Sequence, residues 1–174
     1  LDTVVDLLGA EELTVSDFAL REGLVLDYID RNRRQIARTD RYPDIRRRSV
    51  SELGERCRWN VPHVEHVARL ALSLFDQTRG LHGLGDRERE WLEFAALLHD
   101  IGAHISYERH HKHSYYLIRN GGLRGFEPEE VEAVALIARH HRRGRPKKAH
   151  RALSALREPV QHAVRVGSAL LRIA

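Results

Sequence analysis

The chain has few of the residues that mark secreted or membrane-bound proteins. It contains one cysteine, Cys57, and no methionine among its 174 residues. A single cysteine excludes an internal disulfide and fits a reducing compartment, so we expect a cytoplasmic protein. The longest apolar runs, such as residues 94–98, are far too short to cross a bilayer, and residues 1–30 do not resemble a secretory signal. No membrane partner is therefore expected.

The absence of methionine also bears on what precedes the chain. The sequence begins at Leu1, in what reads as the middle of a structural element. We therefore expect a piece of a longer protein.

The overall composition is that of a soluble globular domain, with 42% hydrophobic and 31% charged residues. Lys and Arg number 29 against 25 Asp and Glu, which gives a net charge of +4. The basic residues crowd into residues 31–48 and 142–151. Either run could attract a polyanion, although a charge run alone is more often a solvated surface.

Apolar residues recur at intervals of three and four along most of the chain, which is the spacing of a helix with one buried face. The stretch from Trp91 to Leu98 is apolar on nearly every side, so its helix should lie at the centre of the core. We predict an all-α fold, apart from a strand or extended link near residues 12–16. The expected helices cover residues 1–8, 18–30, 64–78, 86–98, 111–119, 128–141 and 160–174.

Three segments are expected along the chain. Residues 1–30 contain an amphipathic helix with a face suited to docking. Residues 31–48 are rich in arginine and are interrupted by Pro43, which indicates a basic linker. Residues 49–174 then form the main helical domain, with Ser49 and Glu52 matching a capping box at its start.

The 12 histidines are the main chemical signal, because most of them lie between His63 and His141, near expected helix ends. A single histidine on a helix is usually a hydrogen-bonded core residue. Imidazoles and a carboxylate from several converging helices would instead form a site for a divalent metal such as Mn, Fe, Zn or Mg. The candidate ligands are His63, His99, Asp100, His113, His140 and His141.

Two motifs resemble those of the HD phosphohydrolase domains. Residues 63–71 resemble their opening helix, and residues 94–102 resemble their signature, an apolar helix that ends in His-Asp-Ile-Gly. A narrower resemblance to the exopolyphosphatase and guanosine pentaphosphate phosphohydrolase family covers most of the chain. It is carried by residues 18–24, 46–53, 110–118 and 137–142.

This resemblance implies an HD-type helical bundle, with residues 1–30 as the tail of an actin-like phosphatase domain whose remainder is absent. It makes His63, His99 and Asp100 the primary metal ligands. Asp100 could bridge two metals and help a water attack phosphorus, and Lys112 would assist as a second catalytic residue. The residues expected to hold phosphate oxygens are Arg139, Arg142, Arg143 and Arg145.

One part of the HD pattern is absent. HD domains normally complete the metal site with an aspartate on a late helix, but no aspartate follows Asp100 in this sequence. Residues 167–174 resemble the approach to that aspartate. We expect the parent protein to continue with an aspartate within a residue or two of Ala174, so that the domain here stops before its last ligand.

The leading functional hypothesis is that the full protein hydrolyses phosphoanhydride bonds of polyphosphate or of guanosine pentaphosphate-type nucleotides. One alternative is an independent metal-dependent HD phosphohydrolase acting on a nucleotide or phosphate ester. A non-enzymatic module that binds polyanions or dimerises is another, although nucleic-acid binding is poorly supported because Tyr42 is the only aromatic residue in the basic runs. We expect a homodimer, with polyphosphate or a guanosine polyphosphate as ligand.

Overall fold

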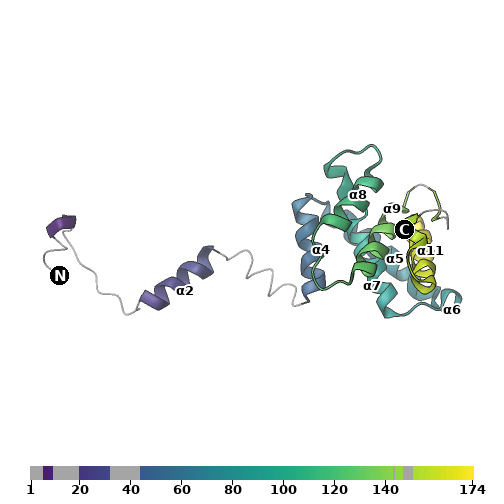
Figure 1. The fold of residues 1–174 in the computed structure, drawn as a ribbon, viewed down its shortest axis with the longest axis horizontal. Helices are drawn as coiled ribbons and strands as arrows, with labels where there is room; N and C mark the ends of the chain where they lie inside the picture. Colours follow the sequence, from purple (N-terminus) through teal and green to yellow (C-terminus); the bar gives the residue numbers. More distant parts are fainter. Residues whose placement is uncertain (1–5, 10–19, 32–43, 143, 147–150) are drawn as a thin grey trace. The chain divides into compact units, whose positions relative to one another are not determined.

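The computed structural model describes residues 6–9, 20–31, 44–142, 144–146 and 151–174, and it divides the chain into two compact units, Leu1–Arg41 and Tyr42–Ala174. In the first unit, α2 (Leu20–Arg31) agrees with the amphipathic helix expected there (Figure 1). None of its residues is buried, and Leu20, Leu24 and Tyr28 are largely exposed. The extended link expected near residues 12–16 lies outside the described residues.

In the part of the second unit that the structure describes, all regular secondary structure is helical, which confirms the all-α prediction (Figure 1). None of the described helices is long and apolar enough to span a bilayer. The elements are α4 (Ile45–Arg56), α5 (Val61–Gln77), α6 (Arg79–His82), α7 (Asp86–Leu98), the 3-10 helix η1 (Ile101–His104), α8 (His110–Asn120), α9 (Pro128–Arg139), α10 (Arg151–Ser154) and α11 (Glu158–Ile173).

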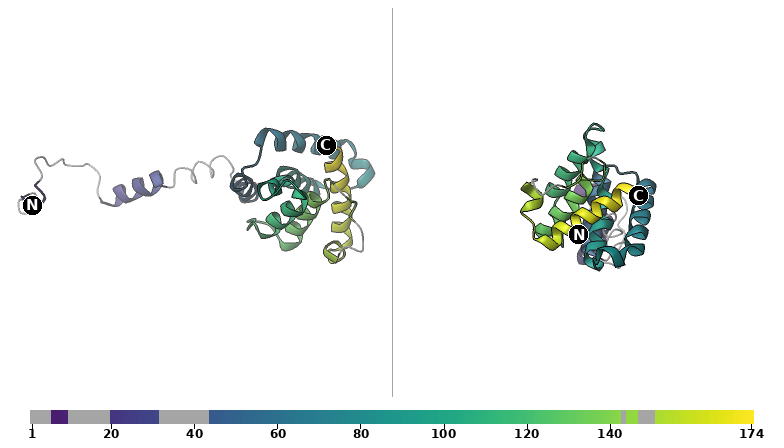
Figure 2. Two further views of the ribbon diagram at one scale, coloured as in Figure 1. Left: turned by 90° about the horizontal axis from the view of Figure 1, so that it is seen from above. Right: turned by 90° about the vertical axis from the view of Figure 1, so that its right-hand side faces the viewer.

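Helix α7 is the central element, as its apolar sequence predicted. It packs against α4, α5, α9 and α11, and seven of its residues from Trp91 onward are buried. In Figure 2 the last helix, α11, runs across the packed helices, where it contacts α5, α7 and α9. The end of the most buried helix therefore delivers residues 99 and 100 to a point where other helices also end.

The first helix of the domain begins earlier than predicted. The carboxylate of Asp44 accepts hydrogen bonds from the amides of Arg46 and Arg47 and so caps α4 at Ile45. The cap expected at Ser49 is wrong: Ser49 is buried inside α4, and its hydroxyl donates to the carbonyl oxygen of Arg46. Residues 45–48, which we had assigned to the basic linker, are helical.

A buried glutamate on α9 joins three elements of the domain. Glu130 is only 3% exposed, and its carboxylate accepts hydrogen bonds from Arg46 on α4, from Arg87 and Trp91 on α7 and from the backbone amide of Glu127. Burial alone would raise the pKa of Glu130. The hydrogen bonds from Glu127, Arg87, Trp91 and Arg46 outweigh it and lower the pKa to about 2.

Glu130→Gln is expected to lower the free energy of unfolding by about 2 kcal/mol, because it leaves the half-buried Arg46 and the more exposed Arg87 without their buried anion. Since the folded-state pKa of about 2 lies below the ordinary value of 4.5, the carboxylate stabilises the fold fully above about pH 4.5 and loses this effect as the pH falls toward 2. Urea unfolding between pH 7 and pH 2.5 should therefore show a shallower loss of stability in the variant.

The neighbouring Glu129 provides the control. It pairs with Arg157, whose side chain is 69% exposed, so Glu129→Gln should cost less than about 1 kcal/mol. Equal losses in the two variants would contradict the role assigned to Glu130.

Candidate metal centre

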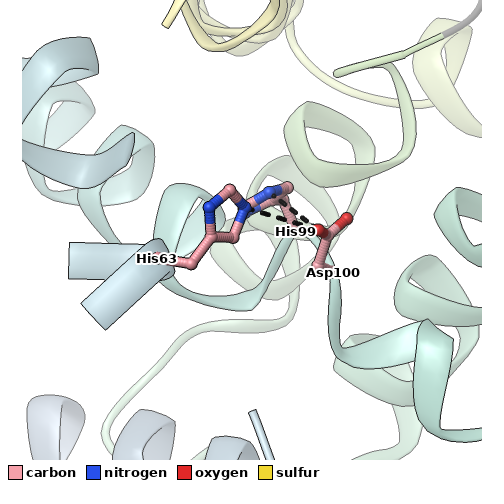
Figure 3. Close-up of side chains that lie close together, drawn as sticks. All are labelled: His63, His99 and Asp100. Atoms are coloured by element: carbon pink, nitrogen blue, oxygen red, sulfur yellow. Dashed lines mark ion pairs between the residues drawn. The ribbon is translucent and has the colours of Figure 1, made fainter. Parts of the chain in front are cut away.

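Four histidines and one aspartate converge from different helices of the domain. His63 lies in the first turn of α5, while His99 and Asp100 directly follow α7. His110 begins α8, and His141 lies just beyond the end of α9. Figure 3 shows the rings of His63 and His99 facing the carboxylate of Asp100.

The two carboxylate oxygens of Asp100 face different pairs of imidazoles. Its Oδ2 lies 3.6 Å from Nε2 of His63 and 3.4 Å from Nε2 of His99. Its Oδ1 lies 3.2 Å from Nε2 of His110 and 3.7 Å from Nε2 of His141. In each of the two trios, the potential ligand atoms lie within 4.8 Å of one another. Asp100 is thus shared by two adjacent three-residue groups.

Backbone carbonyl groups fix the orientation of three of the four rings. In each case Nδ1 of the ring faces the carbonyl oxygen of the residue three positions earlier. Since a carbonyl oxygen only accepts hydrogen bonds, Nδ1 carries the proton, and Nε2 faces Asp100 as a lone pair in the neutral ring or as an N–H donor in the protonated ring. The pairs are His99 with Ala96 at 2.7 Å, His110 with Tyr107 at 3.0 Å and His141 with Ala138 at 2.6 Å.

The electrostatics of the site favour an ionised carboxylate at Asp100. Burial raises the pKa of Asp100, but a hydrogen bond with His99 and the nearby imidazoles of His99, His141 and His110 lower it to about 2. Burial is the main cause that lowers the pKa of His141, to about 4. Near neutral pH, Asp100 is therefore an anion and His141 is a neutral imidazole.

The backbone behind the site holds α7 and α8 together. The Ser114 hydroxyl on α8 donates to the carbonyl oxygen of His99 at 2.6 Å and accepts from the amide of Gly102 at 2.9 Å. A Cβ at Gly102 would overlap the His110 carbonyl oxygen and the Ser114 amide nitrogen. The glycine of the His-Asp-Ile-Gly motif therefore lets α8 approach closely enough to bring His110 to Asp100.

This donor set fits divalent transition metals. Neutral imidazole nitrogens combined with one carboxylate suit Mn, Fe or Zn. Nε2 of His110 and Nε2 of His141 lie 3.3 Å apart, close enough for both to bind one ion together with Asp100. His63 and His99, together with the other oxygen of Asp100, could bind a second ion.

Comparison with known proteins places this domain in a family. Residues 45–174 match the family model described as Ppx/GppA phosphatase, domain III. The chain belongs to the Ppx/GppA phosphatase family. The resemblance drawn from the sequence motifs is therefore confirmed at the level of the family.

Curated relatives agree with this assignment, and three of them are named guanosine-5'-triphosphate,3'-diphosphate pyrophosphatase. The protein of Vibrio parahaemolyticus is 32% identical over 180 residues, which cover 100% of this chain and 33% of the relative. The proteins of Aeromonas hydrophila and Vibrio atlanticus are 31% and 30% identical, over 79% and 82% of this chain and 26% and 27% of their own lengths. The chain thus spans about a third of the length of these Ppx/GppA relatives.

In this domain, some of the residues expected at the metal site lie close together, and one histidine that was not expected lies with them. His63, His99, Asp100 and His141 lie in the two trios, together with His110, which we had not chosen. Helix α8 begins at His110 rather than at residue 111, so the first residue of the helix takes the position beside Asp100. The excess of histidines in residues 110–113 was the signal, but it did not show which of them faces inward.

Three other expected residues lie outside both trios. His113 is three residues beyond His110, and its Cβ lies beside the position that a Gly102 side chain would take. Nδ1 of His140 lies 3.1 Å from the Gly144 carbonyl oxygen, because successive residues of a helix end point in different directions. Lys112 is exposed on α8.

The arginines expected to hold phosphate are dispersed. The guanidinium of Arg139 lies 4.9 Å from the ring centre of Tyr115, and that of Arg142 lies 5.7 Å from the ring centre of Tyr107. Arg145 is exposed, and Arg143 lies outside the described residues, as does much of both basic runs. Of these four, Arg142 borders a pocket of about 320 Å³ that Tyr107 also lines.

Proposed function

We propose that this chain is an HD-type metal-binding domain of a phosphohydrolase that cleaves phosphoanhydride bonds in guanosine pentaphosphate-type nucleotides or polyphosphate. The observation that carries the proposal is Asp100, whose two oxygens each face two imidazole nitrogens. This arrangement resembles a two-ion site with a bridging carboxylate. The names of the Vibrio and Aeromonas relatives support the guanosine nucleotide as substrate.

Different residues of the chain would have different roles in such a site. A bound divalent ion would supply Lewis-acid stabilisation of phosphoryl oxygens and would lower the pKa of nearby water. Asp100 supplies the negative charge that offsets the ions, and the backbone-anchored rings of His99, His110 and His141 hold their Nε2 atoms in place. The side chains of His63 and Asp100 are 49% and 39% exposed, so this edge is open to substrate.

Catalysis in this domain is favoured over a purely non-enzymatic module by its open edge. A pocket of about 360 Å³ is lined by His63 and Asp100, so a ligand can reach the candidate ligands directly. A site that only stabilised the fold would be closed on all sides by protein donors.

Metal titration of the purified chain tests the proposal. We expect Mn²⁺, Fe²⁺ or Zn²⁺ to bind, with up to two ions per chain as measured by calorimetry and elemental analysis. His110→Ala should weaken binding by about tenfold or more, because a ligand is lost. His113→Ala, three residues along the same helix, is the matched control and should bind metal as the unaltered chain does.

Two results would contradict the proposal. One is an unaltered chain that binds no divalent metal after purification without chelator. The other is a greater loss of affinity in His113→Ala than in His110→Ala.

A further inference from the structure

The pocket beside the candidate metal centre is lined in part by an arginine that none of the roles above has used. The pocket lies between the end of α4, the start of α5 and η1, and its lining includes Arg58, His63, Asp100 and His104. Two of these side chains belong to the candidate metal centre. Arg58, whose side chain is always positively charged, lines the same pocket.

Arg58 occupies a backbone position that favours glycine. The amide of Arg58 donates to the Glu55 carbonyl oxygen at 3.0 Å, and the amide of Trp59 donates to the Gly54 carbonyl oxygen at 3.1 Å. These two bonds form the Schellman motif that ends a helix, in which the residue at Arg58 adopts a left-handed conformation. Its φ is 53°. Glycine takes this conformation freely, whereas a side chain makes it unfavourable.

The surroundings hold the strained residue in place. A Cβ at Gly54 would overlap the ring of Trp59, so this ring lies directly against the α4 backbone. The side chain of Asn60 then caps α5 by accepting from the amide of His63 at 3.3 Å. Arg58 thus lies between the end of α4 and the packed Trp59, three residues before the helix that carries His63.

Arg58 also differs in its charge environment from the other described non-glycine residue with positive φ. That residue is Arg109, whose guanidinium lies 3.6 Å from the carboxylate of Glu108. Among the residues that the structure describes, no ion pair joins Arg58 to a carboxylate. Backbone strain that persists beside a reactive centre is commonly associated with function.

We propose that the pocket of Arg58, His63 and Asp100 is a phosphoryl-binding site, in which the guanidinium of Arg58 holds the oxygens of the phosphate that reacts. The inference rests on the proposed function, because it places that phosphate beside the metal ligands. The planar fork of a guanidinium matches two phosphate oxygens, and an arginine without a carboxylate partner has its donors available. The retained backbone strain is then explained by the position of the side chain.

Binding of inorganic pyrophosphate to the 174-residue chain tests this proposal, with and without Mn²⁺. We expect Arg58→Gly to weaken pyrophosphate binding by about tenfold or more in calorimetry, since hydrogen bonds to a charged group are lost. The pyrophosphate affinity of Arg58→Lys should lie between those of the unaltered chain and Arg58→Gly, because lysine keeps the charge but lacks the planar guanidinium. The matched control is Arg69→Gln on α5, an exposed arginine outside the pocket, which should bind as the unaltered chain does.

A stability readout separates this role from a structural one. Arg58→Gly should raise the melting temperature of the metal-free chain, because glycine removes the strain at positive φ. Asparagine also tolerates this conformation, so Arg58→Asn should likewise weaken pyrophosphate binding and raise the melting temperature. A fall in melting temperature would show that Arg58 serves the fold and would overturn the argument from strain.

The remaining outcomes each decide the proposal. Unchanged pyrophosphate binding in Arg58→Gly, an equal loss in Arg69→Gln, or no pyrophosphate binding by the unaltered chain would overturn it. A loss seen with guanosine diphosphate but not with pyrophosphate would overturn phosphate recognition in favour of nucleoside recognition. If the chain binds no metal, the proposed function fails, while the metal-free comparison still decides the role of Arg58.

Discussion

Asp100→Ala is expected to weaken divalent metal binding by about a hundredfold or more, the largest loss of any single substitution in the chain. Its two oxygens face the pair of His63 and His99 and the pair of His110 and His141, so one change removes a ligand from both trios. It also removes the negative charge that offsets the ions. Calorimetric titration with Mn²⁺ measures the effect.

Two comparisons sharpen this test. Glu65→Gln removes an exposed carboxylate two residues after His63 and should leave metal affinity unchanged. Asp100→Asn keeps the shape but not the charge, so it should retain the fold and still bind metal poorly. Metal affinity within about threefold of the unaltered chain in Asp100→Ala would mean that the histidines alone form the site.

Gly102→Ala is expected to lower the free energy of unfolding by about 3 kcal/mol and to weaken metal binding as well. The added Cβ would overlap backbone atoms of His110 and Ser114, which cannot move without shifting α8 away from η1. For a domain of this size, the melting temperature should fall by roughly 10 °C. Because His110 moves with α8, the trio of Asp100, His110 and His141 should lose more affinity than the other trio.

Gly80→Ala is the matched control. Gly80 lies in α6, and a Cβ there would meet no atom within 4 Å. Alanine in an open helical position should be neutral or stabilising by about 0.5 kcal/mol. A loss in Gly102→Ala no larger than that in Gly80→Ala would contradict the close approach of η1 and α8.

The long helices could be predicted because their apolar residues recur at helical spacing and so mark the face that is buried. Residues such as Val64, Val67 and Phe75 recur on one face of α5, and that face is buried. The short helix η1 was missed because its support is not local. The amide of Gly102 bonds to the hydroxyl of Ser114, twelve residues further along the chain.

The site was predicted in part for a similar reason. His63, His99 and Asp100 lie in motifs that identify them individually. His110 lies in a run that also contains His111 and His113, and only the phase of α8 decides which ring faces inward. That phase depends on the left-handed conformation of Arg109 just before the helix, with φ at 55°, which periodicity cannot show.

The backbone bonds of His99, His110 and His141 also determine what happens before a metal arrives. Each ring is held by a carbonyl oxygen of its own helix or turn, so folding alone aims its Nε2 at Asp100. In a zinc finger, by contrast, the ion assembles the ligands and folding waits for it. Here the candidate ligands are held in place by the fold itself, so the proposed binding of an ion would require little movement of the chain.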